Sequence, residues 1–246
     1  MKTPLPSDLP SDLQGRIILI TGASRGIGYA TAKLLAKAGA HIIALARTVG
    51  GLEELDDAIK AADGPGKASL IPVDLTNADA MDRLQPALLE RFGKIDGFIA
   101  NAGILGELSP VADITEKVWD QVMTTNLKAN WRLTQALDPM LRQSDAGRVV
   151  YLTSGVARTH TPYWAPYSVS KAALEALALT YAKEVENTSM RVNVCNPGAT
   201  RTAMRAAAMP GEDASTVPHP DEIAVLLTQM VSPSWTKNAE VVVFGG

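Results

Sequence analysis

Residues 16–28 read RIILITGASRGIG and decide the fold. The first six are apolar on both faces, as in a strand buried inside a parallel sheet. Glycines follow at positions 22, 26 and 28, and a helical pattern runs over 26–38. A strand, a glycine-rich turn and a helix in this order favour a nucleotide site, because the backbone can approach a phosphate there. The alternative is that the glycines form only a tight joint between strand and helix. Their spacing is G-x-x-x-G-x-G rather than the commoner G-x-G-x-x-G.

Apolar runs and helical patterns continue to alternate along the chain. This rhythm predicts an α/β, Rossmann-like, doubly wound fold with a seven-stranded, mainly parallel sheet and helices on both faces. Residues 1–14 are predicted to form a mobile leader and residues 15–246 a single catalytic domain. The other strands are expected at 41–46, 69–73, 95–100, 148–153, 191–195 and 240–244, and the other helices at 51–62, 78–92, 115–142, 165–187 and 221–231.

Composition narrows the function classes. A net charge of −3 with scattered basic residues gives no nucleic-acid footprint. The single cysteine, Cys195, excludes an intrachain disulfide framework and a multi-cysteine metal site, and it is expected in the core. No apolar stretch is long enough for a membrane span, and no secretory leader is recognisable. We therefore predict a cytoplasmic protein that needs neither metal nor membrane.

The glycine-rich turn predicts the first half of a dinucleotide site. An NAD site usually places an acidic residue about 20 residues beyond the glycines, where it binds the ribose 2′-hydroxyl. Here Ala46 stands at that place and Arg47 follows it, with Arg25 as a second cation. Guanidinium groups favour a 2′-phosphate, so we predict NADP over NAD. The alternative is that both arginines are solvated surface charges.

Tyr167 and Lys171 lie four residues apart, which places them on one face of a helix. A phenol normally titrates near pH 10, and a neighbouring ammonium group favours the phenolate. We therefore expect Lys171 to lower the pKa of Tyr167, so that the phenol can act as a general acid or base. Ser154 lies thirteen residues upstream. Arg158, Arg201 and Arg205 are interpreted as solvated charges, with binding of an anionic substrate as the alternative.

Taken together, the glycine turn, the tyrosine–lysine pair and Ser154 resemble the short-chain dehydrogenase/reductase family over residues 15–246. The resemblance implies catalytic roles for four residues: Tyr167 as proton donor, Ser154 holding the substrate oxygen, Lys171 binding the nicotinamide ribose, and Asn126 linking lysine through water to solvent. It also implies a cofactor site formed by Gly22, Ser24, Arg25, Gly26, Ile27, Gly28, Arg47, Asp74, Leu75, Asn101, Ala102, Gly103, Tyr167, Lys171, Pro197, Gly198, Thr200 and Thr202.

The resulting hypothesis is an NADP(H)-dependent oxidoreductase that interconverts a small-molecule carbonyl and an alcohol. A nucleotide-binding regulator with the same fold and little turnover is the alternative. The helix over 165–187 is apolar nearly all round, which predicts a homodimer or homotetramer through the two long helices. Burial of that helix beneath a loop of the same chain is the other explanation.

Overall fold

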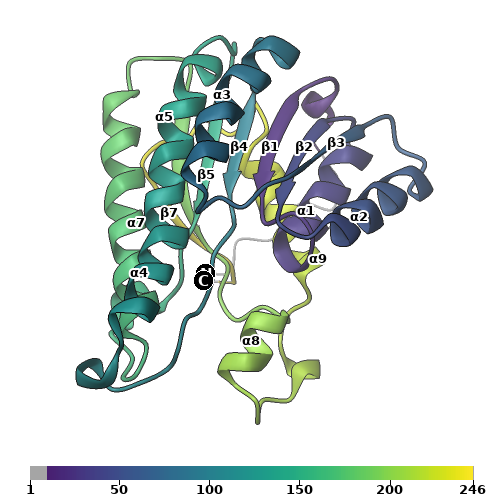
Figure 1. Ribbon diagram of the computed structural model, residues 1–246. Helices are drawn as coiled ribbons and strands as arrows, with labels where there is room; N and C mark the ends of the chain where they lie inside the picture. Colours follow the sequence, from purple (N-terminus) through teal and green to yellow (C-terminus); the bar gives the residue numbers. More distant parts are fainter. Residues whose placement is uncertain (1–9, 246) are drawn as a thin grey trace.

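The protein contains one parallel sheet, and the computed structural model describes residues 10–245 (Figure 1). The strand order is β3-β2-β1-β4-β5-β6-β7, and every neighbouring pair is parallel. This confirms the predicted doubly wound α/β fold and its seven strands. The strands are β1 (Ile17–Thr21), β2 (His41–Ala46), β3 (Lys67–Pro72), β4 (Gly97–Ala100), β5 (Arg148–Leu152), β6 (Arg191–Asn196) and β7 (Val241–Val243).

Helices cover both faces of the sheet, as predicted. One face packs against α1 (Gly26–Lys37), α2 (Val49–Ala61) and α9 (Pro220–Met230). The other packs against α3 (Ala78–Phe92), α5 (Ala129–Leu141) and α7 (Ala165–Glu184). Shorter helices are α4 (Glu116–Met123), α6 (Val156–Thr159) and α8 (Ala203–Ala208), and 3-10 turns occur at Ser11–Leu13, Val111–Asp113 and Ala214–Thr216. None of the helices described within residues 10–245 is long and apolar enough to cross a membrane.

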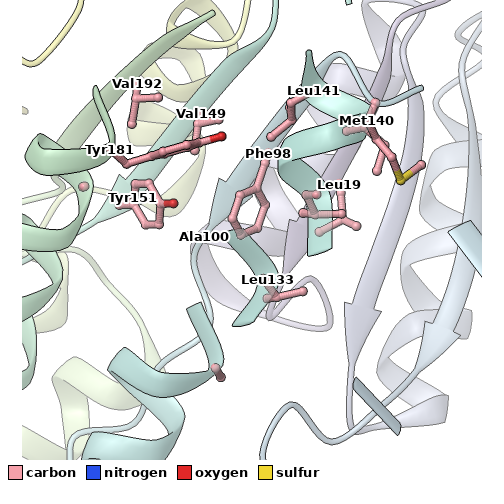
Figure 2. Close-up of a cluster of buried hydrophobic side chains, with 14 of the residues drawn as sticks. Leu19, Phe98, Ala100, Leu133, Met140, Leu141, Val149, Tyr151, Tyr181 and Val192 are labelled. Atoms are coloured by element: carbon pink, nitrogen blue, oxygen red, sulfur yellow. The ribbon is translucent and has the colours of Figure 1, made fainter. Parts of the chain in front are cut away.

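The core is divided by the sheet into two layers. In β1, Leu19 faces one layer while Ile18 and Ile20 face the other, and all three are completely buried. Burying one such side chain contributes roughly 1.5–3 kcal/mol. In the layer beneath α5 and α7, the ring of Phe98 lies edge-on to Tyr151, with the ring centroids 5.9 Å apart (Figure 2). Two-sided burial explains why the strands appear as continuous apolar runs in the sequence.

The strand order reverses direction around β1. Strand β1 pairs with β2 on one side and with β4 on the other, so the connections leave toward opposite edges of the sheet. A crevice forms at such a point beyond the carboxyl ends of the strands, where ligands bind in open α/β sheets. The turn at residues 22–25 opens into this crevice.

The predicted long helix over 115–142 is interrupted. Thr115 caps α4 by accepting a hydrogen bond from the Val118 amide, as its type and place suggest. A turn of π-helix, Thr124–Lys128, then separates α4 from α5, and the Ala129 amide donates to the Thr124 carbonyl five residues back. Such insertions are frequently found at functional sites. Asn126 lies inside this turn and is completely buried.

The predicted mobile leader needs a correction over the residues that the structure describes. Leu13 is completely buried in the α1/α9 layer. The Asp12 carboxylate accepts hydrogen bonds from the Ser232 hydroxyl at 2.7 Å and from the Ser234 amide at 3.1 Å. These partners lie about 220 positions away in sequence, so Asp12 contacts the far part of the chain. The packed domain therefore begins before Gly15. Residues 1–9 of the predicted leader lie outside the described residues.

Candidate active site

A cleft of about 730 Å³ lies at the carboxyl ends of the central strands. Its size is within the range of roughly 300–1,000 Å³ typical of ligand and cofactor sites. Fifteen of the residues predicted for the site line it: Gly22, Ser24, Arg25, Gly26, Ile27, Arg47, Asp74, Leu75, Asn101, Ala102, Gly103, Tyr167, Lys171, Pro197 and Thr202. Within the described part of the chain, Gly28, Asn126, Ser154, Gly198 and Thr200 do not line it.

The glycine-rich turn places the amino end of α1 against the cleft. Gly22 and Gly26 both adopt positive φ, at +67° and +58°. No side chain caps the helix at Arg25, so the amides of its first turn are left to bind an anion. Gly28 is packed tightly: a Cβ there would lie 2.4 Å from the Gly22 carbonyl oxygen. Gly28 therefore serves the close packing of the helix on the turn.

Asn101 fastens the end of β4 to this turn. Its Nδ2 donates to the carbonyl oxygens of Thr21 at 2.8 Å and of Gly22 at 3.2 Å. In return, the Thr21 hydroxyl accepts from the amides of Asn101 and Ala102, each at 3.0 Å. These four bonds hold the two central strand ends in a fixed relation, and both the glycine-rich turn and the segment 101–103 line the cleft.

The basic residues predicted to select the cofactor, Arg25 and Arg47, also line the cleft. Arg25 and Arg47 are exposed, and Ala46 at the end of β2 is buried. Asp74 Oδ1 accepts from both the amide and the hydroxyl of Thr76, and these bonds lower the pKa of the carboxyl. The positive charge of Arg47 adds to the effect, so Arg47 and Asp74 act on the same part of the cleft.

Tyr167 and Lys171 line the cleft, and Ser154 lies next to Tyr167. Burial raises the pKa of Tyr167 to about 12, and a hydrogen bond with the Ser154 side chain opposes that rise. The expectation that Lys171 lowers this pKa is not met. Lys171 Nζ lies 5.7 Å from the centre of the tyrosine ring and donates to the Leu152 carbonyl at 2.8 Å. Burial also lowers the pKa of Lys171, to about 8. This value lies above neutral pH, so the Lys171 side chain remains mostly protonated there.

The π-turn delivers Asn126 to the space behind Lys171. Its Oδ1 accepts from the Ile104 amide at 2.8 Å, and its Nδ2 donates to the Ile104 carbonyl and to Ser170 Oγ. Its main-chain carbonyl accepts from Asn130 Nδ2 at 2.7 Å. A Cβ on Gly103 would stand 3.3 Å from Asn126 Oδ1 and 3.5 Å from Lys171 Nζ. The asparagine and the lysine therefore both lie close to Gly103, where a Cβ would crowd Asn126 slightly and make an ordinary contact with Lys171.

The segment after β6 closes the cleft from the remaining side. Gly198 turns the chain with φ at +65°, and the Thr202 hydroxyl caps α8 through the Arg205 amide. Thr200 is buried, and its hydroxyl donates to the Pro197 carbonyl at 3.1 Å. Thr200 thus stabilises the turn and is not among the residues that line the cleft, and its contact with the cofactor stays a prediction.

Some other lining residues were not predicted from the sequence. Tyr29 and Lys33 stand one turn apart on α1, beyond the glycine turn, and His219, Pro220 and Asp221 begin α9. Their place in the cleft depends on the packing of α9 against α1, which no local pattern reveals. The helical spacing of Tyr29 and Lys33 was the one available hint.

The three arginines interpreted as solvated charges are engaged in contacts within the chain. Arg158 binds the Glu175 carboxylate, Arg205 binds both carboxylate oxygens of Glu212, and Arg201 donates to the Val217 carbonyl. Cys195 is completely buried, as expected, and burial raises the pKa of its thiol to about 12. No cluster of three or more metal-ligating side chains occurs among residues 10–245.

Known proteins resemble this chain in sequence and structure. The family model described as short chain dehydrogenase matches residues 16–213. The Escherichia coli K12 protein named uncharacterized oxidoreductase YciK is 39% identical over 87% of this chain and 85% of its own. The Thermotoga maritima protein named 3-oxoacyl-(acyl-carrier-protein) reductase FabG is 35% identical over 78% of this chain and 77% of its own. A short chain dehydrogenase from Escherichia coli CFT073, complexed with NADPH, superposes with a TM-score of 0.89 at 35% identity, over 96% of this chain and 100% of that one.

Proposed function

The chain belongs to the short chain dehydrogenase family, and from this membership we propose that it is an NADP(H)-dependent oxidoreductase that interconverts a carbonyl and an alcohol. The observation that carries the proposal is the convergence of Ser154, Tyr167 and Lys171, of which the tyrosine and the lysine line the cleft. These groups supply a proton donor, a hydrogen bond to hold the substrate oxygen and a fixed positive charge. A protein that only bound a nucleotide would not need this set.

The cleft fits a phosphorylated dinucleotide. The amides of α1 favour a pyrophosphate, and Gly22 lets the backbone approach it. Arg25 and Arg47 line the cleft and are exposed, so both guanidinium groups are free to bind a 2′-phosphate, and no acidic residue stands at Ala46. The relative complexed with NADPH supports the choice of NADP over NAD. When bound, the nicotinamide supplies the hydride.

Tyr167, Ser154, Lys171 and Asn126 each have a separate role in the reaction. In reduction, Tyr167 gives its proton to the carbonyl oxygen, since a phenol with a raised pKa is protonated at neutral pH. Ser154 holds the same oxygen and stabilises the phenolate that remains. Lys171 holds the nicotinamide ribose and keeps a positive charge beside the tyrosine. Asn126, fixed by Ile104, connects the lysine through water to solvent.

A cofactor oxidation screen tests the function. NADPH and NADH are each offered with ketones, aldehydes, quinones and acyl thioesters, and the expected result is turnover with NADPH for at least one class. Acyl thioesters are included because one relative is named for a 3-oxoacyl substrate. Tight NADPH binding without oxidation in any of these reactions would instead favour the nucleotide-binding regulator.

We also propose a homodimer or homotetramer through the two long helices. Trp131 on α5 and Val169 on α7 are 45% and 42% exposed, and Ala172 and Ala176 continue an exposed apolar row on α7. No described segment of residues 10–245 covers this row, so the alternative of a covering loop gains no support.

The single buried cysteine fits a reducing compartment, and we keep a cytoplasmic location as part of the proposal.

Trp131→Arg is expected to lower the molecular mass in solution to that of a smaller assembly or of the monomer. A charge in an apolar interface must lose its hydration without a partner, which disfavours association. Light scattering at micromolar protein concentration measures the mass. Glu53→Arg on α2, in the opposite helix layer, is the matched control and should leave the mass unchanged. A monomeric wild-type protein would exclude the oligomer.

A further inference from the structure

Helix α7 presents a polar row toward the segment that carries Ser154. Ser168, Lys171 and Glu175 follow at intervals of three and four residues, which places them on one side of the helix. Ser168 Oγ donates to the Val156 carbonyl at 2.6 Å, and Lys171 Nζ donates to the Leu152 carbonyl at 2.8 Å. The catalytic helix therefore holds the chain on both sides of Ser154.

Glu175 makes the most extensive of these contacts. Its Oε1 accepts from the hydroxyl of Thr153 at 2.7 Å, directly before Ser154. Its Oε2 accepts from Nη2 and Nε of Arg158 on α6, at 3.1 Å and 3.2 Å. Both Thr153 and Glu175 are buried. One carboxylate thus fastens the residue before Ser154 and the short helix after it to the helix that carries Tyr167.

We propose that Glu175 is a positioning residue that fixes Ser154 for its hydrogen bond to the tyrosine and to the substrate oxygen. Hydrogen bonds to a charged acceptor are short and directional, and two separate oxygens bind two separate points of the same segment. After Ser154 the chain forms the α6 turn, in which the amides of Ala157 and Thr159 donate to the carbonyls of Ser154 and Gly155. Without Glu175, Ser168 and Lys171 would still hold two carbonyls of this segment, but the side chains of Thr153 and Arg158 would lose their partner on α7.

The proposal rests on the proposed function, and a double-mutant cycle tests it. Glu175→Ala in the holoenzyme is expected to lower kcat on the order of tenfold to a hundredfold, because small displacements of a catalytic group are costly. In a Ser154→Ala background the same change should have almost no further effect, since no hydroxyl remains to be positioned. If the double variant lost kcat by the product of the two single-variant factors, the proposal would be overturned. An unchanged kcat in folded Glu175→Ala would overturn it as well.

Three further measurements separate positioning from other effects. Glu184→Ala, an exposed glutamate on the same helix, is the matched control and should behave as wild type. The affinity for NADPH should stay unchanged, because an effect through Lys171, one turn away on α7, would weaken it. Arg158→Ala removes only the ion pair with Glu175, and because Arg158 is exposed the change should leave folding intact. It should lower kcat by a smaller factor than Glu175→Ala. A normal kcat in that variant combined with weak NADPH binding in Glu175→Ala would also contradict the proposal.

Hydrogen–deuterium exchange gives a readout that does not depend on turnover. The amides of Ala157, Arg158 and Thr159 are bonded within the Ser154 segment, and they should exchange faster in Glu175→Ala than in wild type. If wild-type protein reduced no carbonyl, the proposed function would fail while this exchange still decided whether Glu175 holds the segment. Equal exchange in both proteins would show that it does not.

Discussion

Tyr167→Phe is expected to lower kcat by about 10²–10⁴-fold, the usual contribution of a general acid. Phenylalanine keeps the ring that packs edge-on against Trp164, so the cleft retains its shape. Only the hydroxyl that bonds with Ser154 and gives its proton to the substrate is removed. The affinity for NADPH should remain close to that of wild type. Steady-state kinetics and a fluorescence titration with NADPH measure the two quantities.

Tyr29→Phe is a matched control for this loss. Tyr29 lines the same cleft, but its hydroxyl donates only to the Glu54 carbonyl at 3.4 Å. Removing that hydroxyl should leave kcat nearly unchanged. A Tyr167→Phe protein with wild-type kcat would show that another group donates the proton, and the roles of Ser154 and Lys171 would then need revision.

Local patterns were sufficient for most of the fold. Strands buried on both faces must be apolar throughout, so runs such as 17–21 and 41–46 show in the sequence. The glycine turn was visible because positive φ restricts residue choice. The least apolar strand, β3, begins at Lys67 rather than at the predicted Ser69, since part of it is exposed and lacks the continuous pattern.

Features set by distant contacts were missed. The π-turn at Thr124–Lys128 accompanies the binding of the Asn126 side chain to Ile104, 22 residues away, so the helix pattern continues across it. Arg158 is exposed, in line with its interpretation as a solvated charge, but its ion pair was missed because its partner Glu175 lies on another helix. The raised pKa of Tyr167 depends on burial, which the spacing of tyrosine and lysine cannot reveal. The types of the site residues could be predicted, whereas their burial and bonds could not.

Arg47→Ala is expected to raise the KM for NADPH about tenfold or more while leaving the KM for NADH unchanged. A hydrogen bond to a charged group contributes roughly 1.5–3 kcal/mol, and 1.4 kcal/mol corresponds to a factor of about ten. The guanidinium of Arg47 is exposed, so the lower end of this range applies. NADH lacks the 2′-phosphate and makes no such hydrogen bond, so its KM should not change. Kinetics with each cofactor at a fixed carbonyl concentration provide the comparison.

Two companion variants make the comparison specific to the phosphate. Arg83→Ala removes an exposed arginine from α3, and it should change neither KM. Arg25→Ala should weaken NADPH in the same direction as Arg47→Ala, because both side chains line the same cleft. If Arg47→Ala weakened NADPH and NADH equally, the guanidinium would contact a part that the two cofactors share. The selection for NADP would then have to come from Arg25 and the missing acidic residue at Ala46.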